Sequence, residues 1–235
     1  MTDSFFGSQA TKWTSLYGSQ ASYRDRYGQL QLILDQVLPA TPGRVLDVGC
    51  GTGVFSRSLA ERGWTVVGVD VSEEMIGEAR KQSKGYSIDF QVRPVEHLDA
   101  ERESFDAVVA LSMLEYVEDD GSALDTLAGL LRPGGVLFLT VPNRVGLVRR
   151  LETVVWRARQ RFGGRLVEGR RSYLAYQRHQ YVASRLDRAL EARGLSRVYR
   201  SFLTVAIPLP RRVTPFFERQ WWAALYCVAY AKPRP

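Results

Sequence analysis

Cysteine, histidine and long hydrophobic stretches are all scarce in this chain of 235 residues. The two cysteines, Cys50 and Cys227, cannot form the disulfide framework of a small secreted protein, which predicts a reducing, cytoplasmic setting. With two histidines and no cluster of histidine and cysteine at metal-ligand spacing, we expect no metal. No apolar run approaches the ~20 residues of a membrane-spanning helix, and the start lacks a signal-peptide pattern.

The chain does have enough apolar sequence for one large core. Hydrophobic residues make up 45% of it, and short apolar runs alternate with stretches of helical periodicity. That alternation is typical of a doubly wound, mostly parallel α/β sheet with helices on both faces. At this length we expect residues 1–235 to form a single domain, because little sequence is left for a second core.

The most informative segment is the run Val-Leu-Asp-Val-Gly-Cys-Gly-Thr-Gly at residues 45–53. It predicts a buried strand that turns sharply into a helix, and its glycines allow positive φ and let a ligand lie against the backbone. A second apolar run ends at Asp70, where the carboxylate can accept hydrogen bonds from a ribose. These features predict a nucleoside site that contains Asp47, Gly49, Gly51, Gly53 and Asp70.

The spacing of these glycines argues against a dinucleotide. Phosphate-binding loops read G-x-G-x-x-G, whereas this loop reads G-x-G-x-G and continues with Val54. Asp47, two residues before the first glycine, would repel a phosphate but suits a cationic or zwitterionic ligand. An NAD-dependent oxidoreductase is therefore disfavoured.

The loop resembles the S-adenosylmethionine (SAM) loop of class I methyltransferases, and further blocks follow in the order of that family. Residues 105–117 resemble its fourth strand and substrate-facing turn, and residues 130–143 its Pro-Gly-Gly turn and fifth strand. The resemblance covers roughly residues 30–143 and 179–235, and the layout is similar to that of the ubiquinone-pathway O-methyltransferases. It implies a seven-stranded, Rossmann-like sheet, SAM as cofactor, and methyl transfer to a small lipophilic or aromatic acceptor, at oxygen rather than nitrogen or carbon.

The resemblance also implies further cofactor contacts. Met75 stands where the family stacks an apolar side chain on adenine, with helix core as the alternative role. The Asp-Ala-Glu that usually follows the third strand is here Pro94-Val95-Glu96, so the usual adenine-binding acid is absent. Adenine recognition would then fall to the Val95 amide and the Glu96 side chain. Val71 and Leu111 complete the expected cofactor set.

Catalytic residues are harder to assign. Methyl transfer from a sulfonium needs mainly alignment, and a base helps only where the acceptor must lose a proton. Family members commonly have Glu-His after the fourth strand, whereas this chain has Glu115-Tyr116. The candidate bases are therefore Tyr116, His97 and His179, although a buried structural histidine is an alternative reading of His179. The expected acceptor-pocket residues are Tyr17, Met113, Asn143 and His179.

Two segments flank the resemblance. Residues 1–40 are expected to form a helical lid over the cofactor, with Trp13, Tyr17, Tyr23 and Tyr27 as its aromatic residues; packing outside the sheet is the alternative. Residues 144–178 form a basic insertion. Its part 144–171 holds nine arginines and two glutamates, a net charge of +7 that equals the net charge of the whole chain.

Apolar side chains at helical spacing predict an arginine-rich amphipathic helix at residues 147–162. Such a helix can bind an anionic membrane surface, extend its arginines into water, or close over an anionic substrate. Nucleic acid is the least favoured partner, because the helix offers only Trp156 and Phe162 for base stacking. The protein would then be cytoplasmic or peripheral to the inner face of the membrane. Two other functions stay open: methylation of an anionic or sugar-containing metabolite, and a catalytically silent SAM-binding regulator.

Overall fold

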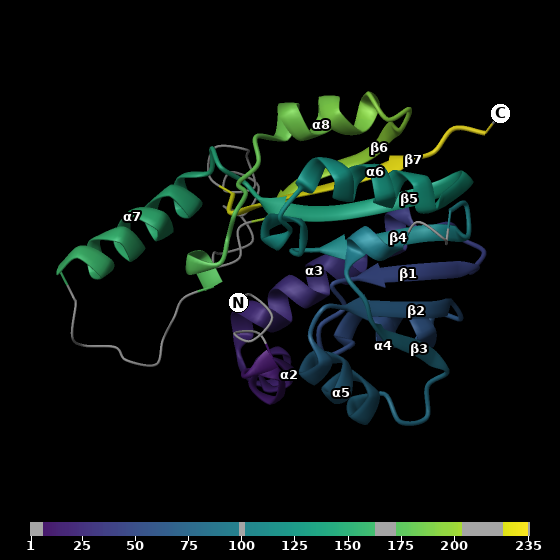
Figure 1. The fold of residues 1–235 in the computed structure, drawn as a ribbon, viewed down its shortest axis with the longest axis horizontal. Coiled ribbons are helices and arrows are strands. Elements are labelled where there is room, and N and C mark those ends of the chain that lie inside the picture. The colour runs from purple at the N-terminus through teal and green to yellow at the C-terminus, as the bar shows by residue number, and fades with distance from the viewer. Residues whose placement is uncertain (1–6, 99–101, 163–172, 204–222, 235) are drawn as a thin grey trace.

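The computed structural model describes residues 7–98, 102–162, 173–203 and 223–234. Its centre is a seven-stranded sheet in the order β3-β2-β1-β4-β5-β7-β6 (Figure 1). The strands are β1 (Arg44–Val48), β2 (Thr65–Asp70), β3 (Ile88–Val92), β4 (Phe105–Leu111), β5 (Leu131–Pro142), β6 (Ser196–Leu203) and β7 (Leu225–Ala231).

The strand directions confirm the predicted mostly parallel sheet. Strands β3, β2, β1, β4 and β5 pair in parallel, and only β7 runs antiparallel to its neighbours β5 and β6. The strand order reverses where β1 and β4 lie side by side, since β2 and β3 continue in one direction and β4 and β5 in the other. Ligands of doubly wound sheets bind at this switch point, beyond the carboxyl ends of the strands.

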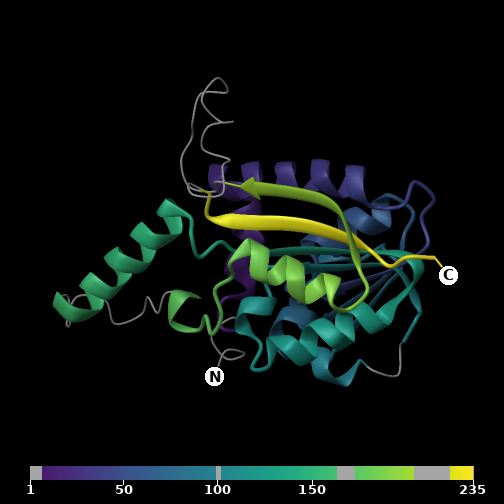
Figure 2. The ribbon, with the colours of Figure 1, turned by 90° about the horizontal axis from the view of Figure 1, so that it is seen from above.

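Helices cover both faces of the sheet, as Figure 2 shows. The helices are α2 (Ala10–Ser19), α3 (Ala21–Val37), α4 (Val54–Glu61), α5 (Glu73–Gln82), α6 (Asp120–Leu130), α7 (Leu147–Phe162) and α8 (Ala183–Glu191). Short 3-10 turns are η1 (Val95–His97), η3 (Leu114–Tyr116) and η4 (Tyr173–Ala175).

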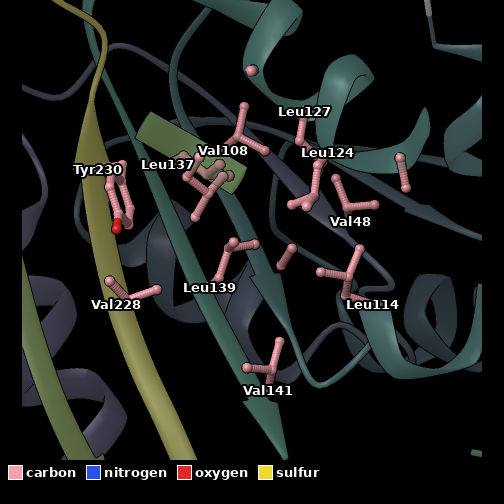
Figure 3. Packing of buried hydrophobic residues seen from close by; sticks show 14 of the residues in the cluster. Val48, Val108, Leu114, Leu124, Leu127, Leu137, Leu139, Val141, Val228 and Tyr230 are labelled. Atoms are coloured by element: carbon pink, nitrogen blue, oxygen red, sulfur yellow. The ribbon is translucent and has the colours of Figure 1, made fainter. Parts of the chain in front are cut away.

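Two large hydrophobic clusters hold the layers together. On one face, α3 and α4 pack on the sheet through residues such as Leu30, Leu34 and Leu59. On the other face lie α6 and α8. Figure 3 shows Leu124 and Leu127 of α6 close to the sheet residues of this second cluster. Both faces of the central strands are therefore buried, which explains why their sequences are almost continuously apolar.

The segments outside this sandwich matter most for function. Helix α2 contacts α5, and Figure 1 shows it with the start of α3 at the end of the sheet where the glycine loop lies. Helix α7 extends away from the body in both ribbon views, with the bounds predicted from the sequence. Arg165, Arg170 and Arg171 of the basic insertion lie outside the described residues. No helix among the residues that the structure describes is long and apolar enough to cross a membrane.

Candidate cofactor cleft and acceptor site

A cleft of about 570 Å³ opens beyond the carboxyl ends of β1, β2 and β4. It brings together residues that are more than two hundred positions apart in the sequence, from Trp13 to Leu225. The predicted site residues that line it are Tyr17, Asp47, Gly49, Gly51, Asp70, Val71, Met75, Val95, Glu96, Leu111, Met113 and Tyr116. Gly53, Asn143 and His179 are not among its lining residues.

The glycine loop adopts the positive φ values that its sequence predicts. Gly49, Gly51 and Gly53 have φ values of 69°, 54° and 72°. A Cβ on Gly49 would lie 2.6 Å from the Cβ of Met113, so only glycine lets the loop approach the turn after β4. A Cβ on Gly53 would lie 2.8 Å from the Phe90 ring. Gly53 therefore permits close packing of the start of α4 against β3; it does not line the cleft, and its role as a cofactor contact stays a prediction.

Asp70 fastens the loop to the next helix. Its Oδ2 accepts a hydrogen bond from the Gly51 amide at 2.9 Å, and its Oδ1 accepts one from the Ser72 amide at 3.0 Å. Ser72 in turn caps α5, because its Oγ accepts a hydrogen bond from the Met75 amide at 3.2 Å. A carboxylate has about four lone-pair sites, so these two bonds leave Asp70 able to accept ribose hydroxyls as well.

Asp47 supplies a second negative group at the same end of the cleft. It is 2% exposed, and its Oδ2 accepts a hydrogen bond from the Ser56 hydroxyl of α4 at 2.6 Å. Burial raises the pKa of Asp47 to about 6, and the charge of Asp70 adds to the rise. Two neighbouring carboxylates in a partly closed cleft favour a positively charged ligand, which would relieve their repulsion.

The wall beyond Asp70 is largely apolar. Met75 and Val95 are buried beneath the cleft surface, while Val71 remains 50% exposed. Glu96 lines the cleft beside Val95, in the turn η1. This placement agrees with a flat apolar ring lying against Val71 and Met75, as expected for adenine. The contacts themselves stay predictions.

Aromatic side chains from α2 and α3 also line the cleft. Trp13 and Tyr17 each meet Tyr23 edge to face, with ring centroids 5.8 and 5.5 Å apart. Tyr27 does not line the cleft and packs on Phe55 at 5.2 Å instead. Three of the four predicted lid aromatics thus face the cleft, and the fourth belongs to the core beneath it.

The turn after β4 is held in an unusual conformation. Ser112 has a φ of 53°, a left-handed value that costs a residue other than glycine roughly 1–2 kcal/mol. Its Oγ accepts a hydrogen bond from Nη2 of Arg26 at 2.6 Å and lies 3.2 Å from Oγ1 of Thr140. These contacts fix the turn that presents Met113 to Gly49.

Glu115 follows in η3 and is the site residue that the sequence reasoning missed. It is 2% exposed and lines the cleft. Its Oε2 is buried and has no hydrogen-bond partner among the described residues. Burial raises the pKa of Glu115 to about 7, although the guanidinium groups of Arg149 and Arg26 oppose the rise. An acid inside an otherwise apolar run was the available signal in the sequence.

His179 lies behind the cleft wall. Its Nε2 is 3.1 Å from the carbonyl oxygen of Val117 and 3.3 Å from that of Glu118. Since carbonyl oxygens only accept, Nε2 must carry a proton and donate it. Nδ1 faces Asp120 at 3.7 Å. Neither nitrogen is directed at the cleft, so the geometry does not support His179 as the base or as an acceptor contact; Tyr116 does line the cleft.

Asn143 also has a different place from the one expected. Its side chain is fully buried, and Nδ2 donates to the carbonyl oxygen of Ala223 at 3.0 Å. Its amide donates to the carbonyl oxygen of Ala224 at 2.9 Å. Asn143 therefore joins the end of β5 to the start of β7 and does not line the acceptor pocket.

Arg149, in the first turn of α7, points into the protein. It is 5% exposed, lines the cleft, and pairs with Glu152 at 2.9 Å. On the same helix, Leu151, Val154 and Val155 are 54%, 60% and 48% exposed. Among the described residues, no group of three or more histidine, cysteine, aspartate or glutamate side chains could hold a metal ion.

Comparison with known proteins agrees with this geometry. Residues 46–139 match the methyltransferase domain family. A ubiquinone biosynthesis O-methyltransferase from Xanthomonas axonopodis pv. citri is 39% identical over 143 residues, which are 59% of this chain and 59% of that relative. The match therefore spans little more than half of either protein.

Solved structures extend the similarity of fold to the whole chain. A SAM-dependent methyltransferase from Thermotoga maritima superposes with a TM-score of 0.70 at 18% identity, covering 99% of this chain and 100% of that one. Magnesium protoporphyrin IX methyltransferase from Synechocystis PCC 6803 was solved with bound S-adenosylhomocysteine (SAH). It superposes with a TM-score of 0.69 at 20% identity, covering 98% of this chain and 97% of that one. Together with the cleft, these matches show that the chain has the fold of the SAM-dependent methyltransferases, and that residues 46–139 match the methyltransferase domain family.

Proposed function

We propose that this protein transfers the methyl group of SAM to an oxygen atom of a small lipophilic or aromatic acceptor. The observation that carries the proposal is one continuous cleft lined by two chemically different sets of residues. One set comprises the glycine loop, two carboxylates and an apolar wall, and the other comprises aromatic rings and a buried carboxyl group. The first set suits a cationic nucleoside, and the second suits a planar apolar molecule with a hydroxyl group.

The chain's own residues fit the expected cofactor. Asp70 can accept the ribose hydroxyls, and the negative charge of Asp47 favours the cationic amino-acid end. Gly49 and Gly51 leave no side chain between the backbone and the ligand. When bound, SAM supplies an activated methyl group, so the protein must chiefly align the acceptor with it.

The acceptor class rests on Trp13, Tyr17 and Tyr23, whose rings line the cleft. Rings of this kind favour a flat apolar molecule by stacking and burial. The name of the curated relative, a ubiquinone biosynthesis O-methyltransferase, agrees with oxygen on an aromatic acceptor.

The test combines binding with identification of the acceptor. Calorimetry should show binding of SAM and SAH. Incubation with methyl-labelled SAM and extracts fractionated by polarity, followed by mass spectrometry, should place the label on an oxygen of an apolar or phenolic compound. Label on a sugar or an anionic metabolite would overturn the acceptor class. Tight SAH binding with no labelled product in any fraction would favour a regulatory SAM-binding protein.

We further propose that α7 attaches the protein to an anionic membrane surface, in keeping with the predicted cytoplasmic setting. Its exposed stripe of Leu151, Val154 and Val155 is flanked by the exposed arginines Arg150, Arg157 and Arg161. This is the pattern of a helix that lies in the bilayer interface. Each arginine near an anionic surface contributes ~1 kcal/mol, so three of them amount to roughly a hundredfold in binding.

Vesicle sedimentation tests the attachment. Vesicles of phosphatidylglycerol should sediment the protein, less so at high salt, while phosphatidylcholine vesicles should not. Leu151→Asn should weaken sedimentation. Leu32→Asn is a matched control, because Leu32 is a 64% exposed leucine on α3. If the two variants sedimented equally with phosphatidylglycerol vesicles, or if the protein sedimented equally with both vesicle types, α7 would not be the attachment site.

A further inference from the structure

We infer that Glu115 is the catalytic base that accepts the proton of the acceptor hydroxyl. The inference rests on the proposed function, because only an acceptor that must lose a proton needs a base. Glu115 lies in η3, shortly after β4. It would take the role of proton acceptor for which the sequence had suggested Tyr116 or His179.

Glu115 lies in a turn that lines the cleft next to the glycine loop, which supports this role. Its neighbours in sequence, Met113 and Tyr116, both line the cleft, and Met113 packs against Gly49 of the cofactor loop. The turn is fixed on both sides. Ser112 is held by Arg26, and the carbonyl oxygen of Glu115 accepts hydrogen bonds from the amides of Arg178 and His179 at 2.9 and 3.2 Å.

The side chain has an unmet hydrogen-bonding capacity. Oε2 of Glu115 is buried and has no partner among the described residues, although leaving such a group unsatisfied costs about 1–3 kcal/mol. Asp47, the other buried carboxyl group of the cleft, is bonded to Ser56 at the cofactor end. A hydroxyl group of the acceptor would supply the partner that Glu115 lacks.

The surroundings of this carboxyl group act in opposite directions on the balance between its protonated and its charged form. Arg26 faces it from α3 and Arg149 from α7, and both lower its pKa, while burial raises that pKa to about 7. Glu152 pairs with Arg149 and so weakens that guanidinium's effect. Tyr181 is a further titratable neighbour; burial raises its pKa, and the charges of Asp120 and Glu115 add to the rise. A base is most effective when its pKa lies near the working pH.

The step balances without any further reactant. The acceptor oxygen forms a bond to the methyl carbon as its hydroxyl proton passes to the Glu115 carboxylate. The carbon–sulfur bond breaks, and its electron pair stays on sulfur. Neutral SAH and the methyl ether leave, and the protonated carboxyl group then returns its proton to water.

The first test measures the protonation of Glu115 and needs no acceptor. In protein labelled with ¹³C at the glutamate carboxyl carbons and saturated with SAH, the Glu115 signal is the one missing from Glu115→Gln. It should titrate near pH 7. Arg149→Gln should move the midpoint to higher pH, and Arg149→Lys should restore it. A signal that titrates at an ordinary glutamate value, or that stays protonated throughout the neutral range, overturns the inference.

The second test uses 4-nitrocatechol as the acceptor probe, with SAH formation as the readout. Glu115→Gln should lower kcat by about 10²–10⁴-fold with SAH affinity unchanged. Glu191→Gln is the matched control, because it changes an exposed glutamate of α8 away from the cleft. An unaltered kcat in Glu115→Gln overturns the assignment of Glu115 as the base. Failure of the wild-type protein to methylate any hydroxyl compound instead counts against the proposed function, and the titration still decides the state of Glu115.

Discussion

Replacing Asp70 by asparagine would separate the structural role of its carboxylate from the ribose contact that we propose for it. In the structure, its two oxygens each accept one backbone hydrogen bond, from the amides of Gly51 and Ser72. Asparagine has one acceptor oxygen and one amino group. It can therefore satisfy only one of these amides and must present its own N–H groups to the other.

We expect two losses of free energy, one in the stability of the protein without ligand and one in the binding of SAH. The unsatisfied amide should destabilise the protein without ligand by about 1–3 kcal/mol. Loss of the charged hydrogen bonds to the ribose should cost a further ~1.5–3 kcal/mol of binding free energy. That second loss corresponds to a dissociation constant for SAH roughly 10- to 100-fold higher.

Urea unfolding without ligand measures the first loss, and calorimetric titration with SAH measures the second. Asp125→Asn serves as the control, because Asp125 is a 67% exposed aspartate whose pairing with Arg193 lies at the surface. Unchanged SAH affinity in Asp70→Asn would refute the ribose assignment. If unfolding alone changed, Asp70 would be a structural link between the loop and α5 and nothing more.

Three more predictions follow from the same contacts. Gly49→Ala should abolish SAH binding in calorimetry, because its Cβ would meet Met113 at 2.6 Å; Gly28→Ala, in open space on α3, should leave binding intact. Without ligand, the free energy of unfolding should fall as pH rises from about 4 to 7. In the folded state the pKa of Asp47 is raised to about 6 and that of Glu115 to about 7, so the folded protein keeps these protons to higher pH than the unfolded chain. Each group should lower the free energy of unfolding by roughly 3 kcal/mol across this range. A free energy of unfolding from urea titrations that does not change with pH would contradict this. Asp187→Ala should cost about 3 kcal/mol in the same assay, because Asp187 accepts hydrogen bonds from Tyr226, Tyr230 and Arg197; wild-type stability would show that these groups find other partners.

Local patterns in the sequence were sufficient for most of the fold and for the cofactor half of the cleft. The glycine loop, the acid that ends β2 and the bounds of α7 were all predicted, and they are confirmed. Each depends on residues close together in the chain: positive φ at glycine, alternation in a buried strand, and 3.6-residue spacing in a helix.

The acceptor half could not be predicted in the same way, because its residues acquire their surroundings from distant segments. Glu115 is buried beside Arg26, which comes from α3, and Arg149, which comes from α7. His179 was selected for its chemistry, yet its ring meets the carbonyl oxygens of Val117 and Glu118. Asn143 similarly joins two strands whose pairing the sequence pattern does not specify in detail. At these positions the residue type suggested a chemical role, but the sequence did not show which way each side chain points.

Helix α7 has the amphipathic pattern that the sequence predicts, but the sequence left its orientation open. With 3.6 residues per turn, Arg149 lies roughly opposite the stripe of Leu151, Val154 and Val155. Amphipathic packing on the sheet would bury the stripe and expose the arginine, whereas the structure does the reverse. The arginine is stabilised by Glu152 and by the nearby Glu115, while the stripe is left exposed. Because one helix carries both, the proposed membrane contact of the stripe would also hold in place the Arg149 guanidinium, which lowers the pKa of Glu115.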